Sequence, residues 1–156
     1  MSPSLGLIPV LSVIQNVELP LLLTSLSKRE RRERASTALK VVGLADRAPH
    51  RPQELCGGQA QLAAIARAIV ADPRLLLADE PTGHLDACSA ARILALLQRL
   101  TGDFGKTLVL VTRDPQVAVR ADTRYQLGEG VLSLDGTLSA RRVARTRAGR
   151  GGPSPG

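Results

Sequence analysis

Two short clusters in this sequence combine residue types at spacings that suit phosphate chemistry. The first is the glycine pair Gly57 and Gly58, which opens a helical pattern between Cys56 and Gln59. Two glycines at a helix N-terminus let backbone N–H groups approach an anion closely, and the helix dipole adds a favourable potential there. A phosphate group is the natural ligand of such a terminus, and a polar side chain at Cys56 could add one more donor.

The second cluster is the adjacent carboxylate pair Asp79 and Glu80, which ends a short apolar run. One carboxylate can hold Mg²⁺ directly or through water, and the other can orient and polarise an attacking water. We therefore assign Asp79 to the metal ion and Glu80 to the role of catalytic base.

Two helices are expected to position the glycine pair. Residues 27–43 read as a helix in which Ser27 is the N-cap, Glu30 completes a capping box and Gly43 is the stop signal. A second, alanine-rich helix is expected over about residues 57–71.

Strands alternate with helices in the rest of the chain. Residues 75–78 form a continuous apolar run, which is typical of a strand buried on both faces of a parallel sheet. A helix over about residues 87–100 and a strand over residues 107–112 follow, so the predicted fold class is α/β. A short helical piece near residues 115–120 then precedes a β-hairpin centred on residues 128–130.

The two clusters resemble the motifs of the ATP-binding subunits of ABC transporters. Residues 55–59 read LCGGQ where that family has its LSGGQ signature, and residues 75–80 end in Asp-Glu like its Walker B strand. The resemblance continues through AIARA at residues 64–68 and PTGHLD at residues 81–86, in which Asp86 stands in the family's D-loop. The order and spacing of these motifs make the combined resemblance specific.

The segments before the signature resemble one branch of this family in particular. Residues 7–11 and 16–21 are similar to the branch that works with lipoprotein-releasing and macrolide-export permeases. The resemblance implies a partial P-loop NTPase fold, made of a helical signature subdomain over about residues 10–72 and a second part over about residues 73–138. That second part would hold the Walker B strand, the C-terminal part of the parallel sheet and the hairpin.

The resemblance also implies cofactors, partners and a location. ATP and Mg²⁺ are the implied cofactors, with Cys56, Gly57, Gly58, Gln59 and Asp86 toward the nucleotide. In an intact relative, two subunits sandwich two ATP molecules, each held by the Walker A loop of one subunit and the signature of the other. Hydrolysis then resets a membrane permease. The implied partners are a second ATPase subunit, in a homo- or heterodimer, and a transmembrane permease, so the location is cytoplasmic, at the inner face of the membrane.

The sequence departs from the family at positions that matter for hydrolysis. It contains no GxxxxGK[ST], the Walker A loop that cradles the phosphates, and the family's Q-loop glutamine would fall near Pro3. Arg113 stands where the family has its switch histidine. A neutral imidazole accepts as well as donates hydrogen bonds, whereas a guanidinium only donates and stays charged. We therefore expect little or no ATPase activity from the chain alone, with Arg113 left to contact a γ-phosphate electrostatically.

The missing Walker A region also bears on the sheet. In the family's doubly wound sheet the Walker B strand has parallel neighbours on both sides, and no strand is expected before residue 55 here. One edge of the strand at residues 75–78 should therefore be bare, which predicts marginal stability or dependence on a partner.

Two other functions stay open. The first is a non-catalytic interaction protein that lends residues 56–59 to the Walker A loop of a complete ATPase. The second is a nucleic-acid binder that uses the arginine patches. Phe104 and Tyr125 are the only aromatic residues, and base-stacking surfaces need several, which argues against nucleic acid as a partner.

Composition and charge set the frame for these functions. The chain has 156 residues, 44% of them hydrophobic and 22% charged, which fits one globular domain. Its net charge of +7 lies in two patches, residues 28–51 and the tail at residues 139–156, which we expect to be disordered. No membrane span or secretion signal is expected. Cys56 and Cys88 lack metal or disulfide spacing and should stay thiols in a reducing compartment.

Overall fold

The computed structural model describes residues 6–135, so the tail expected to be disordered and the expected domain end near residue 138 lie outside the described part. The chain divides into two compact units, one ending at Arg113 and the other beginning at Asp114. Each unit is described by itself below. No helix within residues 6–135 is long and apolar enough to span a membrane.

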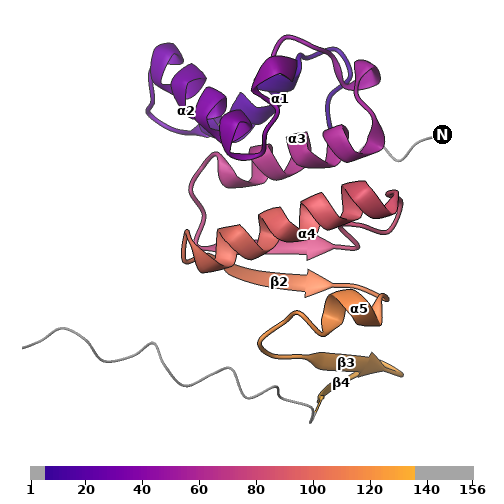
Figure 1. Cartoon of the computed structure of the whole chain (residues 1–156). Helices are drawn as coiled ribbons and strands as arrows, with labels where there is room; N and C mark the ends of the chain where they lie inside the picture. The colour runs from indigo at the N-terminus through magenta and orange to yellow at the C-terminus, as the bar shows by residue number, and fades with distance from the viewer. Residues whose placement is uncertain (1–5, 136–156) are drawn as a thin grey trace, which may run out of the picture. The chain divides into compact units, whose positions relative to one another are not determined.

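The first half of the larger unit is a cluster of helices around an apolar core (Figure 1). Its elements are α1 (Val13–Glu18), η1 (Leu19–Leu23), α2 (Lys28–Val41), η2 (Ala45–Arg47), η3 (Pro52–Glu54) and α3 (Gly57–Ile69). The predicted helices at residues 27–43 and 57–71 are confirmed as α2 and α3. The short helix α1 was not predicted, since proline and polar residues interrupt the apolar stretch around it.

Helix α2 begins and ends as its sequence predicts. The Ser27 hydroxyl accepts a hydrogen bond from the Glu30 N–H at 3.3 Å, and the Glu30 carboxylate accepts one from the Ser27 N–H at 2.8 Å. These hydrogen bonds to Ser27 lower the pKa of the Glu30 carboxyl. Past the C-terminus, Gly43 adopts φ +73°, the left-handed conformation in which glycine commonly ends helices.

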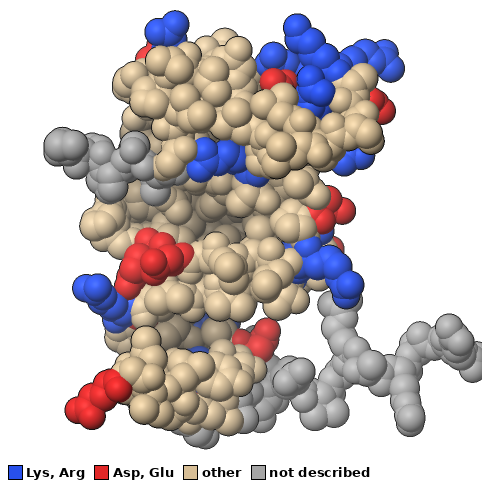
Figure 2. Space-filling model, turned by 180° about the vertical axis from the view of Figure 1, so that it is seen from behind, with Lys and Arg blue, Asp and Glu red and all other residues tan. Residues whose placement is uncertain are grey.

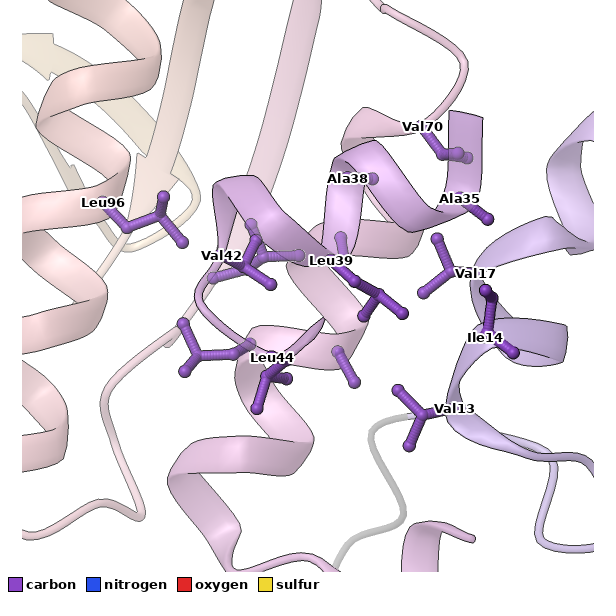
Figure 3. Packing of buried hydrophobic residues seen from close by; sticks show 14 of the residues in the cluster. Val13, Ile14, Val17, Ala35, Ala38, Leu39, Val42, Leu44, Val70 and Leu96 are labelled. Carbon is purple, nitrogen blue, oxygen red and sulfur yellow. The ribbon is translucent and has the colours of Figure 1, made fainter. Parts of the chain in front are cut away.

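The core of the helical cluster forms where α1, α2 and α3 meet. Val17, Leu21 and Leu39 have no exposed surface. Figure 3 shows Leu39 of α2 facing Val13 and Val17 of α1. Small side chains such as Ala35 allow the helices to approach closely.

The second half of the larger unit is a strand–helix–strand arrangement. β1 (Leu75–Asp79) and β2 (Thr107–Val111) pair in parallel, in a register that sets Leu75 opposite Thr107 and Asp79 opposite Val111. The connection between them contains α4 (Ala87–Gly102), which lies against one face of the strands (Figure 1). The predicted α/β class and both predicted strands are confirmed.

The predicted burial of β1 on both faces is wrong. Leu76 is buried under α4, whereas its neighbours Leu75 and Leu77 are 50% and 76% exposed, and Val109 and Val111 of β2 are 49% and 57% exposed. The reason is that this sheet has only two strands within residues 6–135, and a helix covers only one of its faces. β1 has a single strand neighbour there, so the expected bare edge is confirmed.

The smaller unit holds the predicted hairpin. Its described elements are α5 (Pro115–Ala118), β3 (Tyr125–Gly128) and β4 (Val131–Leu134), with β3 and β4 antiparallel. Glu129 and Gly130 connect the strands with φ values of +50° and +79°, as a two-residue type I′ turn requires.

Candidate functional site

The glycine pair lies in the first turn of α3, as predicted. Cys56 is the N-cap residue, and its backbone N–H donates a 3.1 Å hydrogen bond to the side-chain oxygen of Gln59. Cys56 and Gly57 are exposed, and Gly58 and Gln59 are half-buried. The first N–H groups of a helix have no partner within the helix, so this terminus offers donors to an anion.

Gly58 has a packing role that the sequence did not reveal. A Cβ atom at this position would lie 2.6 Å from the Ser89 Oγ and 2.9 Å from the Ser89 Cβ, distances that real side chains do not adopt. A Cβ at Gly57 would meet only the Leu85 side chain, at an ordinary 3.6 Å. Gly58 therefore lets the first turn of α3 pack directly on the first turn of α4.

A small hollow, open to solvent, lies between the two helix termini and is lined by Cys56 and Gln59 at the start of α3 and by Ser89 and Arg92 of α4. Ser89 and Arg92 were not predicted as site residues. Their sequence signal is weak, because both face α3 only as a result of the tertiary packing between the two helices. Arg92 gives this hollow a positive charge that suits an anionic ligand.

Asp86 is the N-cap of α4. One of its carboxylate oxygens accepts a hydrogen bond from the Ser89 N–H at 2.9 Å. Hydrogen bonds from Ser89 hold the pKa of the Asp86 carboxyl below its ordinary value. The predicted D-loop residue is therefore an anion that anchors the helix next to the α3 terminus.

Asp79 and Glu80 end β1 with different environments. Asp79 is exposed, whereas Glu80 is half-buried and hydrogen-bonded through its N–H to the Val111 carbonyl at 2.9 Å. Glu80 adopts φ +43°, a left-handed conformation that is uncommon for a residue with a side chain. Strained backbone of this kind clusters at functional sites.

The structure brings the predicted pair Glu80 and Arg113 together. The Glu80 Oε1 accepts a 2.8 Å hydrogen bond from the Arg113 backbone N–H, and the Arg113 Nε lies 3.7 Å from the same oxygen. The Arg113 side chain is 97% exposed and that of Glu80 is 32% exposed. The residue at the family's histidine position therefore fixes the carboxylate chiefly through its backbone, while its guanidinium reaches into solvent.

The predicted site residues thus form two groups. One joins residues 56–59 to the first turn of α4, and the other joins Glu80 to Arg113. Within residues 6–135 no three His, Cys, Asp or Glu side chains are arranged to hold a metal ion. Mg²⁺ is commonly bound by one or two carboxylates together with phosphate oxygens, and the exposed Asp79 fits that mode.

Curated proteins with similar sequences include ATP-binding proteins of ABC transporters. The ATP-binding protein LolD of the lipoprotein-releasing system of Francisella tularensis (strain FSC 198) is 46% identical over 129 residues, which are 82% of this chain and 56% of LolD. The macrolide export ATP-binding/permease protein MacB of Rhodopseudomonas palustris (strain BisB18) is 45% identical over 145 residues, 91% of this chain and 22% of MacB.

A solved structure gives the same result for the fold. The ATP-binding cassette MJ0796, described as a dimeric post-hydrolysis state bound to ADP and Pi, is 40% identical with a TM-score of 0.73. The match covers 85% of this chain and 60% of that chain. The chain thus spans about half the length of relatives such as LolD and about a fifth of MacB.

The family assignment rests on more than pairwise similarity. A sequence model described as "ABC transporter" matches residues 3–83, which include the signature turn and both Walker B carboxylates. The predicted resemblance and the predicted partial P-loop NTPase fold are therefore confirmed. By motif, fold and sequence model alike, this chain belongs to the ABC transporter ATP-binding family.

Proposed function

We propose that this chain is an ATP-binding subunit of an ABC transporter, or part of one, that couples ATP binding and hydrolysis to a membrane permease. The observation that supports this most is the first turn of α3, where an exposed glycine and a glycine packed on α4 stand at a helix N-terminus. A backbone terminus without side chains admits a phosphate group closely.

The nucleotide would contact this chain mainly through backbone groups. The N–H groups of Gly57 and Gly58 would donate to phosphate oxygens, and the Cys56 thiol would add a weaker donor than the family's serine. Asp86 would stand beside the same turn as the D-loop residue. The lysine and hydroxyl of a Walker A loop would come from another segment or another chain, since the sequence contains no GxxxxGK[ST].

The second group would serve hydrolysis. Asp79 would hold Mg²⁺, which neutralises developing charge on the phosphates when bound. Glu80 would orient a water molecule, with its carboxylate held in place by the Arg113 N–H. Because the Arg113 guanidinium cannot accept a proton, it would act on a phosphate only through its charge and its N–H donors, not as a base. We therefore infer weak or no turnover at a site that depends on these two residues.

The partners we propose are a second ATPase subunit and a transmembrane permease, and the location is cytoplasmic at the inner membrane face. The dimeric state of MJ0796 and the combined ATP-binding/permease name of MacB support these partners. The missing Walker A loop favours a second candidate, in which this chain is non-catalytic and only lends its signature to a complete ATPase. Nucleic acid is not a proposed partner.

The test combines co-purification with an ATPase assay, both on this chain mixed with an ABC ATPase subunit that has an intact Walker A loop. If the signature is lent, ATP strengthens co-purification, and Gly57→Asp abolishes this effect because its carboxylate repels phosphate. Asp in the first turn favours the helix itself, so unfolding cannot explain the loss. Gly128→Asp is the matched control, since nothing lies within 4 Å of a Cβ there and the residue is in strand β3, away from both helix termini.

A second variant separates the two candidates. Glu80→Gln removes the extra hydrolysis that this chain adds to the mixture, above that of the partner alone, if the chain supplies a catalytic base, and leaves it unchanged if the chain only lends its signature. Association that responds neither to ATP nor to Gly57→Asp contradicts both functions.

A further inference from the structure

The face of the β1–β2 sheet that points away from α4 is apolar and exposed. Leu76 of β1 is buried under α4, whereas Leu77 is 76% exposed on the opposite face and lies in register beside Val109 of β2, which is 49% exposed. Leu75 and Val111 extend the same face and are 50% and 57% exposed. We name the surface formed by Leu75, Leu77, Val109 and Val111 the outer sheet face.

Charge on this side of the sheet is confined to one end of the strands. Neither β1 nor β2 contains a charged residue before Asp79, the last residue of β1. Figure 2 shows the chain from the side opposite α4, where an uncharged band crosses the middle of the view and acidic side chains gather at its left end. Glu80 follows β1, and Arg113, whose side chain is 97% exposed, follows β2. The outer sheet face is therefore apolar along the strands and polar where the strands end.

A two-stranded parallel sheet of this kind suits a strand together with a helix. Both faces of a parallel sheet are normally covered, because helices connect its strands. Here α4 covers one face only, and each strand has a single strand neighbour within residues 6–135. A strand that adds in parallel to an open edge, followed by a helix that packs on the outer sheet face, would extend the sheet and cover its second face.

The direction of the added strand determines which chemistry it would bring. A parallel strand ends at the same edge of the sheet as Asp79 and Val111, so the helix that follows it would begin near Glu80. The N-terminus of a helix at the carboxyl edge of a parallel sheet is a phosphate-binding position. Glu80 and Arg113 already lie at this edge and are joined by a hydrogen bond. A strand–loop–helix unit added here would therefore place a phosphate beside the residues proposed for hydrolysis.

We propose that the outer sheet face binds a strand–loop–helix unit of a second polypeptide, whose loop carries the GxxxxGK[ST] pattern that this sequence does not contain. This inference rests on the proposed function and names the surface through which the phosphate loop would arrive, which is alongside the sheet. The match to MJ0796 covers 60% of that chain, so a polypeptide of this family has enough length outside the matched part for such a unit. A second copy of this chain could not supply the loop, since its sequence lacks the pattern.

The test is co-expression of the full chain with the strand–GxxxxGK[ST]–helix segment of an ABC ATPase subunit, made as a separate affinity-tagged polypeptide. We expect the chain to co-purify with this segment whether or not ATP is present, because the sheet makes the contact. Leu77→Lys/Val109→Lys should reduce the recovered chain about tenfold or more, because two ammonium groups would be buried beneath the added helix. Both side chains are exposed in the chain alone, so this variant should keep the far-UV circular dichroism of the parent.

Two variants control for added charge and for the signature turn. Leu22→Lys/Leu23→Lys adds the same two charges at leucines of η1 that are 56% and 94% exposed, and it should change recovery less than about twofold. Gly57→Asp should also leave recovery with the segment unchanged, whereas it abolishes the ATP-dependent association with a complete subunit. Failure of the sheet contact can therefore be distinguished from failure of the signature contact.

Three results would overturn the proposal. The first is that the segment does not recover the parent chain. The second is a loss of recovery with the η1 variant as large as that with Leu77→Lys/Val109→Lys. The third is self-association of the parent chain in analytical ultracentrifugation that disappears with Leu77→Lys/Val109→Lys, without recovery of the segment, which would assign the outer sheet face to a second copy instead.

Discussion

Asn16 is the only polar side chain in the core within residues 6–135, and it is fully buried. Its oxygen accepts a 2.7 Å hydrogen bond from the Ile8 N–H, and its nitrogen donates to the carbonyls of Ile8, Leu11 and Ser12 at 3.0–3.2 Å. The Asn16 side chain thus supplies hydrogen-bond partners to backbone groups of residues 8–12, which do not form a helix or strand.

Asn16→Ala should destabilise the chain by about 2–3 kcal/mol, because buried backbone groups lose their partners. Asn16→Asp should cost at least as much, since a carboxylate would face three carbonyl oxygens. The measurement is the free energy of unfolding in urea. Gln53→Ala, at an exposed amide side chain, is the control, and equal losses at the two positions would contradict this account.

The Asp86 cap predicts a dependence of stability on pH. Its pKa is lower in the folded chain than in the unfolded one, so its contribution is present above the unfolded pKa and disappears as the pH falls through the folded pKa. The stability difference between the parent and Asp86→Asn should therefore shrink from pH 7 to about pH 2.5, below the unfolded Asp value. Thermal unfolding at both pH values measures it, and a constant difference would refute the assignment.

At the scale of elements, the contact between α3 and α4 makes Gly58 unlike its neighbour. Gly58→Ala should cost about 1–3 kcal/mol because the new methyl group collides with Ser89. Ser89→Gly should restore most of this loss, and a double-mutant cycle in urea measures the coupling. Gly57→Ala is the control and should stay within about 0.5 kcal/mol of the parent. Without coupling between residues 58 and 89, the packing role would have to be abandoned.

The two faces of β1 predict opposite effects for adjacent leucines. Leu76→Ala should cost about 2 kcal/mol or more, because Leu76 is 7% exposed under α4. Leu77→Thr should change the free energy of unfolding by less than about 0.5 kcal/mol, and it should reduce self-association in analytical ultracentrifugation. Equal destabilisation by both changes would mean that the outer face of the sheet is covered in solution.

Elements set by local sequence signals could be predicted, and those set by distant contacts could not. Ser27 and Glu30 cap α2 across three residues, so the sequence alone locates that terminus. Glu80 and Arg113 follow two parallel strands, so the carboxyl ends of these strands bring them together. The contact of Ser89 with Gly58 and the exposure of Leu77 depend on which elements pack against each other. A local pattern of apolar residues does not predict that packing.

For the whole molecule, we expect no ATPase activity above background from the isolated chain and no change with Glu80→Gln, because the sequence has no Walker A loop. The open sheet also predicts a thermal transition below about 55 °C, the middle of the range for mesophile domains. Phosphate release and differential scanning calorimetry measure these two quantities. Turnover that disappears with Glu80→Gln, or a cooperative monomeric transition above that temperature, would contradict this account.

The absence of a side chain at Gly58 also has a mechanical consequence. The first turn of α3 rests on the first turn of α4 with only the short Ser89 side chain between them, and Asp86 caps the start of α4 through the Ser89 N–H. A force that displaces the signature turn is therefore transmitted to Ser89 and then to Asp86 within one rigid linkage. The signature turn at residues 56–59 and Asp86 would therefore move together.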